Sequence, residues 1–174
     1  METSRSERVL VTGASGYIAS HCVQQLLLAG YKVRGSVRNI KDSKKVDFLY
    51  KIVPERKDNI ELVQADLLDK ESWVNATKNC TYILHVASPA LLDVKKEEIV
   101  IKPAVEGTLN VLDAALKNGV KKVVITSSVA AIWVGHADEE FDENTWSIES
   151  KCGAYEKSKL LAERAAWDFW RRHY

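Results

Sequence analysis

Short apolar runs alternate with longer stretches of helical period along this chain. The apolar runs are mostly rich in Val, Ile and Leu, which is typical of strands covered on both faces. This alternation predicts βαβ units and a parallel sheet. The five strands are expected at residues 8–12, 32–37, 60–64, 82–86 and 122–126.

The segments between these runs carry signals for helix ends. Gly30 and the pair Asn118-Gly119 mark the ends of two helical stretches. Pro103 lies inside the second of these stretches and is expected to kink or restart that helix. The expected helices span residues 17–29, 43–51, 70–78, 97–117 and 153–172.

The composition narrows the class of protein. With 174 residues, 46% hydrophobic and 28% charged, the chain has the make-up of an ordinary globular domain, which excludes collagen, coiled coil and disorder. Its 25 basic and 24 acidic residues leave a net charge of +1, although a basic stretch lies at residues 32–57. This near-zero net charge gives no overall electrostatic attraction to nucleic acid or to an anionic membrane, and no apolar stretch is long enough for a membrane span. No nucleic-acid or membrane partner is therefore expected.

The three cysteines indicate a reducing compartment. Cys22, Cys80 and Cys152 lie far apart and form no C-x-x-C pair, which argues against a zinc cage or a disulfide framework. No metal site is expected. The polar start at residues 1–8 does not resemble a signal peptide. A cytoplasmic location is therefore expected.

A glycine-rich turn follows the first predicted strand and opens the first helix. Gly13 and Gly16 allow a sharp backbone turn that approaches a pyrophosphate closely, and the amides of the helix N-terminus face its charge. Ala19 is a small residue where the helix packs on the strand. Glycine spacing alone is weak evidence, but its place between strand and helix in an alternating chain predicts a dinucleotide site.

The end of the second strand indicates which dinucleotide is bound. An acidic residue there would hold the ribose 2′-hydroxyl of NAD, whereas an arginine accommodates the 2′-phosphate of NADP. The chain has Arg38 at this point, followed by Lys44 and Lys45. NADP is therefore expected and NAD is less favoured, unless these residues are only a solvated basic face. Asp66 after the third strand could accept from an adenine amino group, and His85 is expected to be buried in the fourth strand.

A tyrosine and a lysine lie four residues apart in the last predicted helix. Tyr155 and Lys159 therefore share one helix face, where the ammonium would favour the phenolate and make Tyr155 a usable acid. The fifth strand ends at Ser127 and Ser128, which could polarise a carbonyl. Ser, Tyr and Lys at the carboxyl ends of a parallel sheet, beside a dinucleotide turn, form a coherent site.

These motifs resemble the extended short-chain dehydrogenase/reductase family. The resemblance is carried by residues 11–19, 126–128 and 155–159, and within the family it is closest to the branch of dihydroflavonol 4-reductase and cinnamoyl-CoA reductase. Supporting segments follow in family order at residues 35–38, 64–67, 85–89, 101–108 and 162–167.

The resemblance implies a Rossmann-type α/β fold, a doubly wound parallel sheet with helices on both faces, that binds NADP and reduces a carbonyl. It implies that Tyr155 protonates the carbonyl oxygen, that Lys159 binds the nicotinamide ribose and tunes Tyr155, and that Ser128 hydrogen-bonds the carbonyl, with Ser127 as the alternative. The implied cofactor contacts are Gly13, Ser15, Gly16, Tyr17 and Ile18 at the pyrophosphate, Arg38 and Lys45 at the 2′-phosphate, Asp66 and Leu67 at the adenine, and Val86, Ala87 and Ser88 along the cofactor.

Two departures from the family bear on the substrate. Ala131-Ile132-Trp133 is apolar where flavonoid reductases have a polar residue, so an aromatic or aliphatic aldehyde or ketone against Trp133 is favoured over a flavonoid. The chain also stops inside its last predicted helix. Residues 1–174 are thus expected to form a single NAD(P)-binding domain, the N-terminal part of a longer reductase that lacks the C-terminal substrate lobe. An apolar face of the last helix would then be uncovered.

Two other functions stay open from the sequence. A nucleotide-sugar epimerase or dehydratase of the same superfamily would usually keep NAD tightly, and Arg38 counts against it. A noncatalytic NADP-binding module would bind the cofactor without turnover. The expected partner is a small carbonyl substrate, and the expected assembly is a monomer or a homodimer.

Overall fold

The structure is a computed structural model that describes residues 5–91, 94–137 and 140–174. Its five strands are β1 (Arg8–Val11), β2 (Lys32–Val37), β3 (Ile60–Gln64), β4 (Tyr82–His85) and β5 (Lys122–Ile125). They form one sheet in the order β3-β2-β1-β4-β5, and every neighbouring pair is parallel. The strand order reverses between β1 and β4, where ligands of such sheets bind outside the carboxyl ends.

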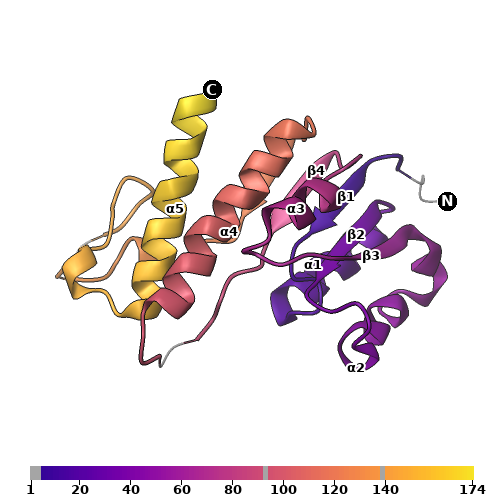
Figure 1. Ribbon diagram of the computed structural model, residues 1–174, viewed down its shortest axis with the longest axis horizontal. Coiled ribbons are helices and arrows are strands. Elements are labelled where there is room, and N and C mark those ends of the chain that lie inside the picture. The colour runs from indigo at the N-terminus through magenta and orange to yellow at the C-terminus, as the bar shows by residue number, and fades with distance from the viewer. Residues whose placement is uncertain (1–4, 92–93, 138–139) are drawn as a thin grey trace.

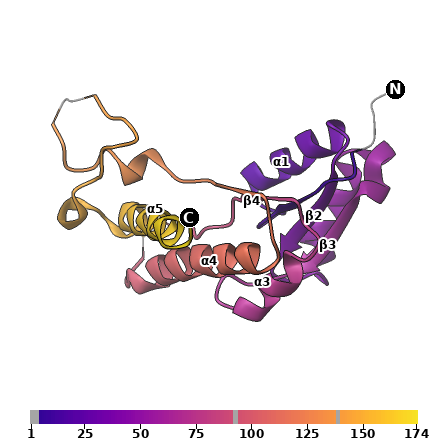
Figure 2. The same cartoon turned by 90° about the horizontal axis from the view of Figure 1, so that it is seen from above.

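Helices cover both faces of the sheet (Figure 1, Figure 2). α1 (Tyr17–Leu28) lies on one face, α3 (Lys70–Ala76) and α4 (Glu98–Lys117) lie on the other, and α5 (Ala154–His173) packs beside α4. Crossover connections between parallel strands are right-handed. The connections from β1 through β2 to β3 run across the sheet in one direction, and the connection from β4 to β5 runs in the other. Their helices therefore lie on opposite faces of the sheet. This is the doubly wound Rossmann-type fold that the sequence motifs predicted.

Two hydrophobic clusters fill the space between the sheet and its helices. Successive residues of a strand point to opposite faces, so Val11 belongs to the cluster under α1, whereas Leu10 belongs to the cluster under α3 and α4. Trp73 and Val111 in the second cluster are fully buried. The apolar strands are therefore covered on both sides, as their composition predicted.

The prediction of one helix at residues 43–51 is only partly correct. α2 (Ser43–Val46) passes into the 3₁₀ helix η1 (Asp47–Lys51), and a second one, η2 (Pro54–Asn59), follows. The buried residues Val46 and Leu49 are three apart, which is the repeat of a 3₁₀ helix. Both side chains therefore face the core from the same side of this segment.

Of the kink or restart expected at Pro103, the restart is wrong. α4 continues through Pro103. Proline removes only the N–H that would bond to the carbonyl of Ile99, and Ile99 is exposed, so water can bond to that carbonyl instead.

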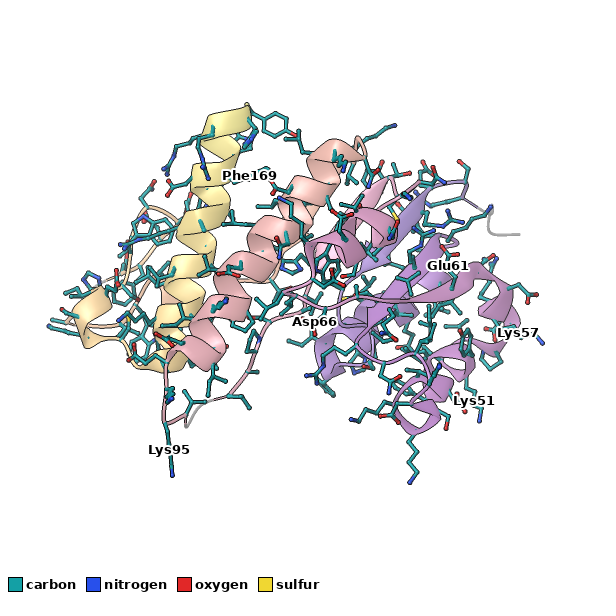
Figure 3. The ribbon with its side chains drawn as sticks, viewed as in Figure 1. Lys51, Lys57, Glu61, Asp66, Lys95 and Phe169 are labelled. Carbon is teal, nitrogen blue, oxygen red and sulfur yellow. The ribbon has the colours of Figure 1, made fainter. Side chains whose placement is uncertain are left out.

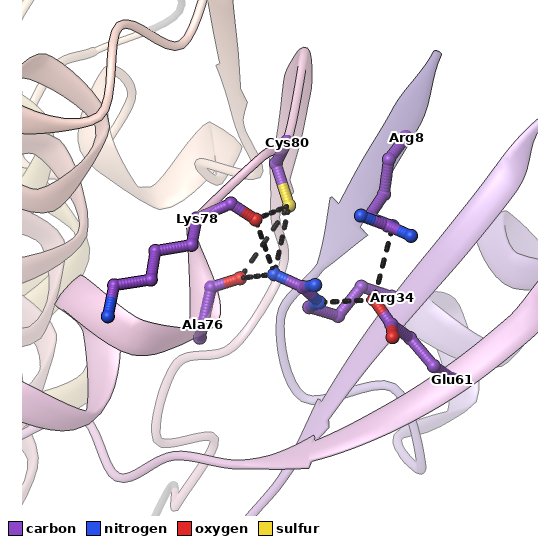
Figure 4. A network of polar contacts seen from close by, with 6 residues as sticks. All are labelled: Arg8, Arg34, Glu61, Ala76, Lys78 and Cys80. Atoms are coloured by element: carbon purple, nitrogen blue, oxygen red, sulfur yellow. Dashed lines mark hydrogen bonds and ion pairs between the residues drawn. The ribbon is translucent and has the colours of Figure 1, made fainter. Parts of the chain in front are cut away.

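A buried arginine ties β2 to the end of α3 (Figure 4). Arg34 Nε donates to Glu61 Oε1 on β3 at 2.5 Å, and its Nη1 donates to the carbonyl oxygens of Ala76 and Lys78 at 2.9 and 2.6 Å. Arg8 Nε lies 3.1 Å from the same carboxylate. The guanidinium therefore bonds to carbonyls at and just beyond the C-terminus of α3, which the helix itself leaves without donors.

β5 lies at one edge of the sheet, next to an open apolar groove. The groove, of about 460 Å³, lies between α4, β5 and α5 and is lined by residues that include Leu116, Val123 and Phe169. Trp167 and Trp170 of α5 also line it and are 47% and 53% exposed. An apolar face of the last helix is thus uncovered in this chain, as expected from the sequence.

Candidate functional site

The glycine-rich turn joins β1 to α1 at the carboxyl edge of the sheet. Gly13 has a φ of +65°, and a Cβ there would lie 3.1 Å from the Cβ of Ala87, so only glycine fits without strain. Ser36 on β2 holds the turn, because its hydroxyl accepts the Gly13 N–H at 3.1 Å and its carbonyl accepts the Ala14 N–H at 2.8 Å. The sequence analysis missed Ser36, whose signal was a polar residue within a buried strand.

The first amides of α1 are available to a ligand. Gly16 is the N-cap and offers no side chain, and among residues 5–91, 94–137 and 140–174 no acceptor bonds to the N–H groups of Ser15, Tyr17 or Ile18. All four residues are exposed. A helix N-terminus with free amides binds phosphate groups. The turn therefore leaves amides available for a phosphate group, and the pyrophosphate contacts of these residues stay a prediction.

Gly35 lies in β2 against the same turn. A Cβ at this residue would lie 2.7 Å from the Cβ of Ala14 and 2.9 Å from Leu62 Cδ2. We expect Gly35→Ala to lower the free energy of unfolding by about 1–3 kcal/mol, because Ala14 has no flexible side chain that could move away. Urea denaturation measures this loss. A variant as stable as the parent would show that the turn can shift at no cost.

The end of β2 presents basic side chains. Arg38 is exposed, and no ion pair engages it in the part of the chain that the structure describes. Lys45 is also exposed and pairs with Asp42 at 3.4 Å. A free guanidinium at this point suits a phosphate, whereas NAD would need a carboxylate there. The structure therefore keeps Arg38 available for the role predicted from the sequence, while Lys45 would have to leave Asp42.

Asp66 and Leu67 follow β3 on the same edge (Figure 3). Asp66 is exposed, its Oδ1 accepts the N–H of Leu68 at 2.9 Å, and its own N–H bonds to the Ser72 hydroxyl at 3.2 Å. These bonds fix the backbone of the segment. Leu67 packs against α4, where a Cβ on Gly107 would lie only 2.7 Å from Leu67 Cδ2. Asp66 is thus held at the edge, and its contact with an adenine amino group stays a prediction.

Val86, Ala87 and Ser88 follow β4 and are half-buried. The hydroxyl of Thr12 accepts the N–H groups of Val86 and Ala87 at 3.0 and 2.9 Å. These bonds hold the segment against the glycine-rich turn, at the carboxyl edge of the sheet where the sequence analysis predicts the cofactor.

His85 is buried beneath this segment, as the sequence predicted. Burial, and then the nearby Lys159 ammonium, lower the pKa of His85 from 6.5 to about 4.

Because of this lowered pKa, the unfolded chain binds the proton of His85 first as the pH falls. We expect the free energy of unfolding to decrease between about pH 6.5 and 4, by at most about 1.4 kcal/mol per pH unit from this residue. Urea denaturation across this range measures the slope, and His85→Asn should make it shallower; equal slopes would contradict the prediction.

The two serines after β5 make different contacts. The Ser127 hydroxyl donates a short hydrogen bond to the Glu163 carboxylate on α5. The Ser128 hydroxyl oxygen accepts the Ala130 N–H at 3.1 Å, at the start of the 3₁₀ helix η3 (Val129–Ala131). The Ser127 hydroxyl therefore already donates its hydrogen bond to Glu163, whereas the Ser128 hydroxyl can still donate one to another acceptor.

Tyr155 and Lys159 lie one turn apart on α5. The Lys159 ammonium is 6.0 Å from the centre of the Tyr155 ring. Lys159 is only 8% exposed, burial lowers its pKa, and its ammonium has no hydrogen-bond acceptor among the described residues. The Lys159 Nζ is not among the fully buried polar atoms that lack a partner, so it still reaches solvent and can take an acceptor from a ligand. The hydroxyls of a bound ribose would supply one, so this position fits a nucleotide cofactor.

The carboxyl ends of β4 and β5 meet α5 around a small cavity of about 20 Å³. Ser88, Ser127 and Lys159 are among the residues that line it. The structure therefore brings the segment after β4, Ser127 after β5 and the lysine of α5 together, whereas Ser128 and Tyr155 do not line this cavity. Glu163 and Thr12, which the sequence analysis did not single out, hold these elements in place through hydrogen bonds.

Comparisons with known proteins agree with this geometry. Residues 9–174 match the model of the NAD dependent epimerase/dehydratase family. The chain is 42% identical over 171 residues to cinnamoyl-CoA reductase CAD2 of Medicago truncatula, across 92% of this chain and 52% of the relative. It is 40% identical over 176 residues to a bifunctional dihydroflavonol 4-reductase/flavanone 4-reductase of Malus domestica, across 95% and 50%. The crystal structure of a yeast methylglyoxal/isovaleraldehyde reductase complexed with NADPH has a TM-score of 0.82 at 30% identity, across 95% of this chain and 53% of that one.

The chain spans about half the length of the curated relatives it matches. These relatives confirm the resemblance to the dihydroflavonol 4-reductase and cinnamoyl-CoA reductase branch. The match to the family model covers both the glycine-rich turn and the helix with Tyr155 and Lys159. The chain therefore belongs to the NAD dependent epimerase/dehydratase family.

Proposed function

We propose that this chain is the cofactor-binding part, residues 1–174, of a longer NADP-dependent reductase that converts an aldehyde or ketone into an alcohol. The observation that carries the proposal is Lys159, a largely buried side chain whose ammonium has no acceptor among the described residues and lies 6.0 Å from the centre of the Tyr155 ring. The free amides of α1 lie at the same edge of the sheet. The reductase names of the relatives and the NADPH in the yeast enzyme support it.

The residues along the carboxyl edge would hold NADP in an extended position. The amides of Ser15, Tyr17 and Ile18 would bind the pyrophosphate, and Arg38 would bind the 2′-phosphate with Lys45 as a second cation. Adenine would lie beside Asp66 and Leu67, and the nicotinamide half beside Val86, Ala87 and Ser88. When bound, NADPH supplies the hydride for carbonyl reduction.

Tyr155 would supply the proton. As the carbonyl oxygen gains negative charge, the phenol O–H of Tyr155 donates its proton to it, and the alcohol O–H forms. The Lys159 ammonium stabilises the phenolate that remains, because opposite charges attract strongly at a buried site. The Ser128 hydroxyl donates a hydrogen bond to the same oxygen, in the manner of an oxyanion hole. Ser127 is less suited to this role because its hydroxyl already donates a hydrogen bond to the Glu163 carboxylate.

The proposed substrate is a small aromatic or aliphatic carbonyl compound. Val129 and Trp133 follow Ser128 and are 66% and 49% exposed, so they offer an apolar surface next to the reacting group. No helix in the described ranges is long and apolar enough to cross a membrane. The cytoplasmic location, the absence of a nucleic-acid partner and the monomeric or homodimeric state stay predictions.

Titration of NADPH and NADH into the 174-residue chain tests the proposal. We expect NADPH to bind at least about tenfold more tightly, which corresponds to about 1.4 kcal/mol. Arg38→Ser should remove most of this preference, because the 2′-phosphate loses its free cation. Lys51→Ser is the matched control, since it removes one exposed charge from the 3₁₀ helix η1 and should leave the preference unchanged.

Two results would contradict the proposal. Equal affinity for NADH and NADPH would show that Arg38 does not read the 2′-phosphate. Binding of neither cofactor would show that these residues do not form the site by themselves. NAD retained tightly through purification would instead favour epimerase or dehydratase chemistry.

A further inference from the structure

A buried network joins the carboxyl ends of β1 and β4 to the middle of α4 through His85. The side chain is 2% exposed. Its Nδ1 lies 2.9 Å from the Thr12 hydroxyl oxygen, and its Nε2 lies 3.4 Å from the hydroxyl oxygen of Thr108 on α4. The proposed reaction does not use this imidazole, although it is a titratable group close to the proposed cofactor site.

The bonds around Thr12 determine which nitrogen of His85 carries the proton. The Thr12 hydroxyl oxygen already accepts the N–H groups of Val86 and Ala87 at 3.0 and 2.9 Å. A hydroxyl has two lone pairs and one proton. The lone pairs are therefore used, and the proton of Thr12 has His85 Nδ1 as its acceptor. Nδ1 then carries no proton of its own.

The other side of the ring completes the same pattern. The proton of the neutral imidazole must lie on Nε2, where it faces Thr108 Oγ1. The Thr108 hydroxyl donates its own proton to the carbonyl of Ala104 at 2.8 Å, so its oxygen is free to accept. Every donor in this chain of bonds thus has one acceptor, and only one tautomer of His85 satisfies all of them.

We propose that His85, as the neutral Nε2–H tautomer, is a positioning residue that fixes the backbone of Val86 and Ala87 against the glycine-rich turn through the hydroxyl of Thr12. The position of Gly13 shows how close this fit is, since a Cβ there would lie 3.1 Å from Ala87 Cβ. In so far as this backbone faces NADP, the inference rests on the proposed function.

A second proton on His85 would break the network. An Nδ1–H would face the Thr12 hydroxyl, whose lone pairs are both used, and one amide of Val86 or Ala87 would lose its acceptor. The charged groups that line the adjoining cavity with His85 are Lys159 and Glu163 of α5, while β1, α4 and β5 contribute only neutral side chains there. Burial and Lys159 oppose the second proton and lower the pKa of His85 to about 4.

The imidazole nitrogen chemical shifts of the 174-residue chain test the tautomer directly by NMR, with no cofactor needed. At neutral pH we expect the Nε2–H form for His85. An Nδ1–H form or a charged ring would overturn the proposal. This measurement uses the parent chain, so it does not depend on whether any variant folds.

Three variants then test the positioning. Thr12→Val keeps the shape but removes the hydroxyl, and we expect faster amide exchange at Val86 and Ala87 and a loss of about tenfold in NADPH affinity, comparable to one hydrogen bond. Thr12→Ser keeps the hydroxyl and should restore both. Thr108→Val removes only the partner of His85 Nε2. It should change the imidazole nitrogen chemical shifts of His85 more than it changes amide exchange at Val86 and Ala87.

The outcomes separate this inference from the proposed function. Unchanged amide exchange in Thr12→Val, or no rescue by Thr12→Ser, would overturn the positioning role. A parent chain with the Nε2–H tautomer and protected amides that binds no NADPH would support the positioning of the backbone and contradict the proposed function.

Discussion

We expect Tyr155→Phe in the full-length reductase to lower turnover of a carbonyl compound by roughly 100- to 10,000-fold, which is the usual effect of losing a general acid. Phenylalanine keeps the ring that lies 6.0 Å from the Lys159 ammonium and removes only the proton donor. The affinity for NADPH should therefore change less than about threefold, equivalent to well under 1 kcal/mol. Turnover is followed by the absorbance of reduced nicotinamide with a panel of aromatic and aliphatic aldehydes, and affinity by nicotinamide fluorescence.

Tyr50→Phe is the matched control for this prediction. It removes the same hydroxyl from an exposed residue of the 3₁₀ helix η1, outside the proposed site, and should leave turnover and binding as they are. Unchanged turnover in Tyr155→Phe would show that another group delivers the proton. NADPH binding with no turnover, whether residue 155 is tyrosine or phenylalanine, would instead favour a noncatalytic NADP-binding module.

Arg34→Met is expected to lower the free energy of unfolding by about 3 kcal/mol, because it removes a buried cation and leaves its acceptors without a donor. Methionine fills a similar volume, so the loss reports the bonds to Glu61, Ala76 and Lys78 (Figure 4). For a chain of this size the thermal midpoint should fall by about 6–12 °C. Thermal and urea denaturation measure both quantities.

Lys32→Met is the matched control for Arg34→Met. Lys32 begins the same strand, is exposed and forms no ion pair in the described part of the chain. Its loss should change stability by no more than about 0.5 kcal/mol. Equal effects of the two substitutions would show that the buried bonds of Arg34 contribute nothing beyond its charge.

The difference between these two basic residues shows where sequence reasoning stops. Arg34 and Lys32 lie in one basic stretch of the sequence, and nothing local separates them. Only the pairing of β2 with β3 and the end of α3 place acceptors around Arg34. The acceptors are contributed by residues 27 to 44 positions away in the chain, a separation that no local pattern reports.

Ser127 and Ser128 show the same limit within the proposed site. The sequence left both as candidates for the carbonyl contact, because they are adjacent and chemically identical. In the structure the two hydroxyls differ in their partners, because Glu163, 36 residues after Ser127, accepts a hydrogen bond from the Ser127 hydroxyl. Ser36 and Thr12 likewise hold the cofactor-facing turn and the segment after β4 through contacts between strands.

Local sequence was enough to predict the alternation of strands and helices, the glycine-rich turn and the spacing of Tyr155 and Lys159, because each of these depends on neighbouring residues and on the period of one element. The burial of Arg34, the different hydrogen-bond partners of Ser127 and Ser128 and the hydrogen bonds of His85 arise only in the folded chain. These features depend on desolvation and on donors and acceptors from distant segments, which become neighbours only when the sheet and its helices pack together.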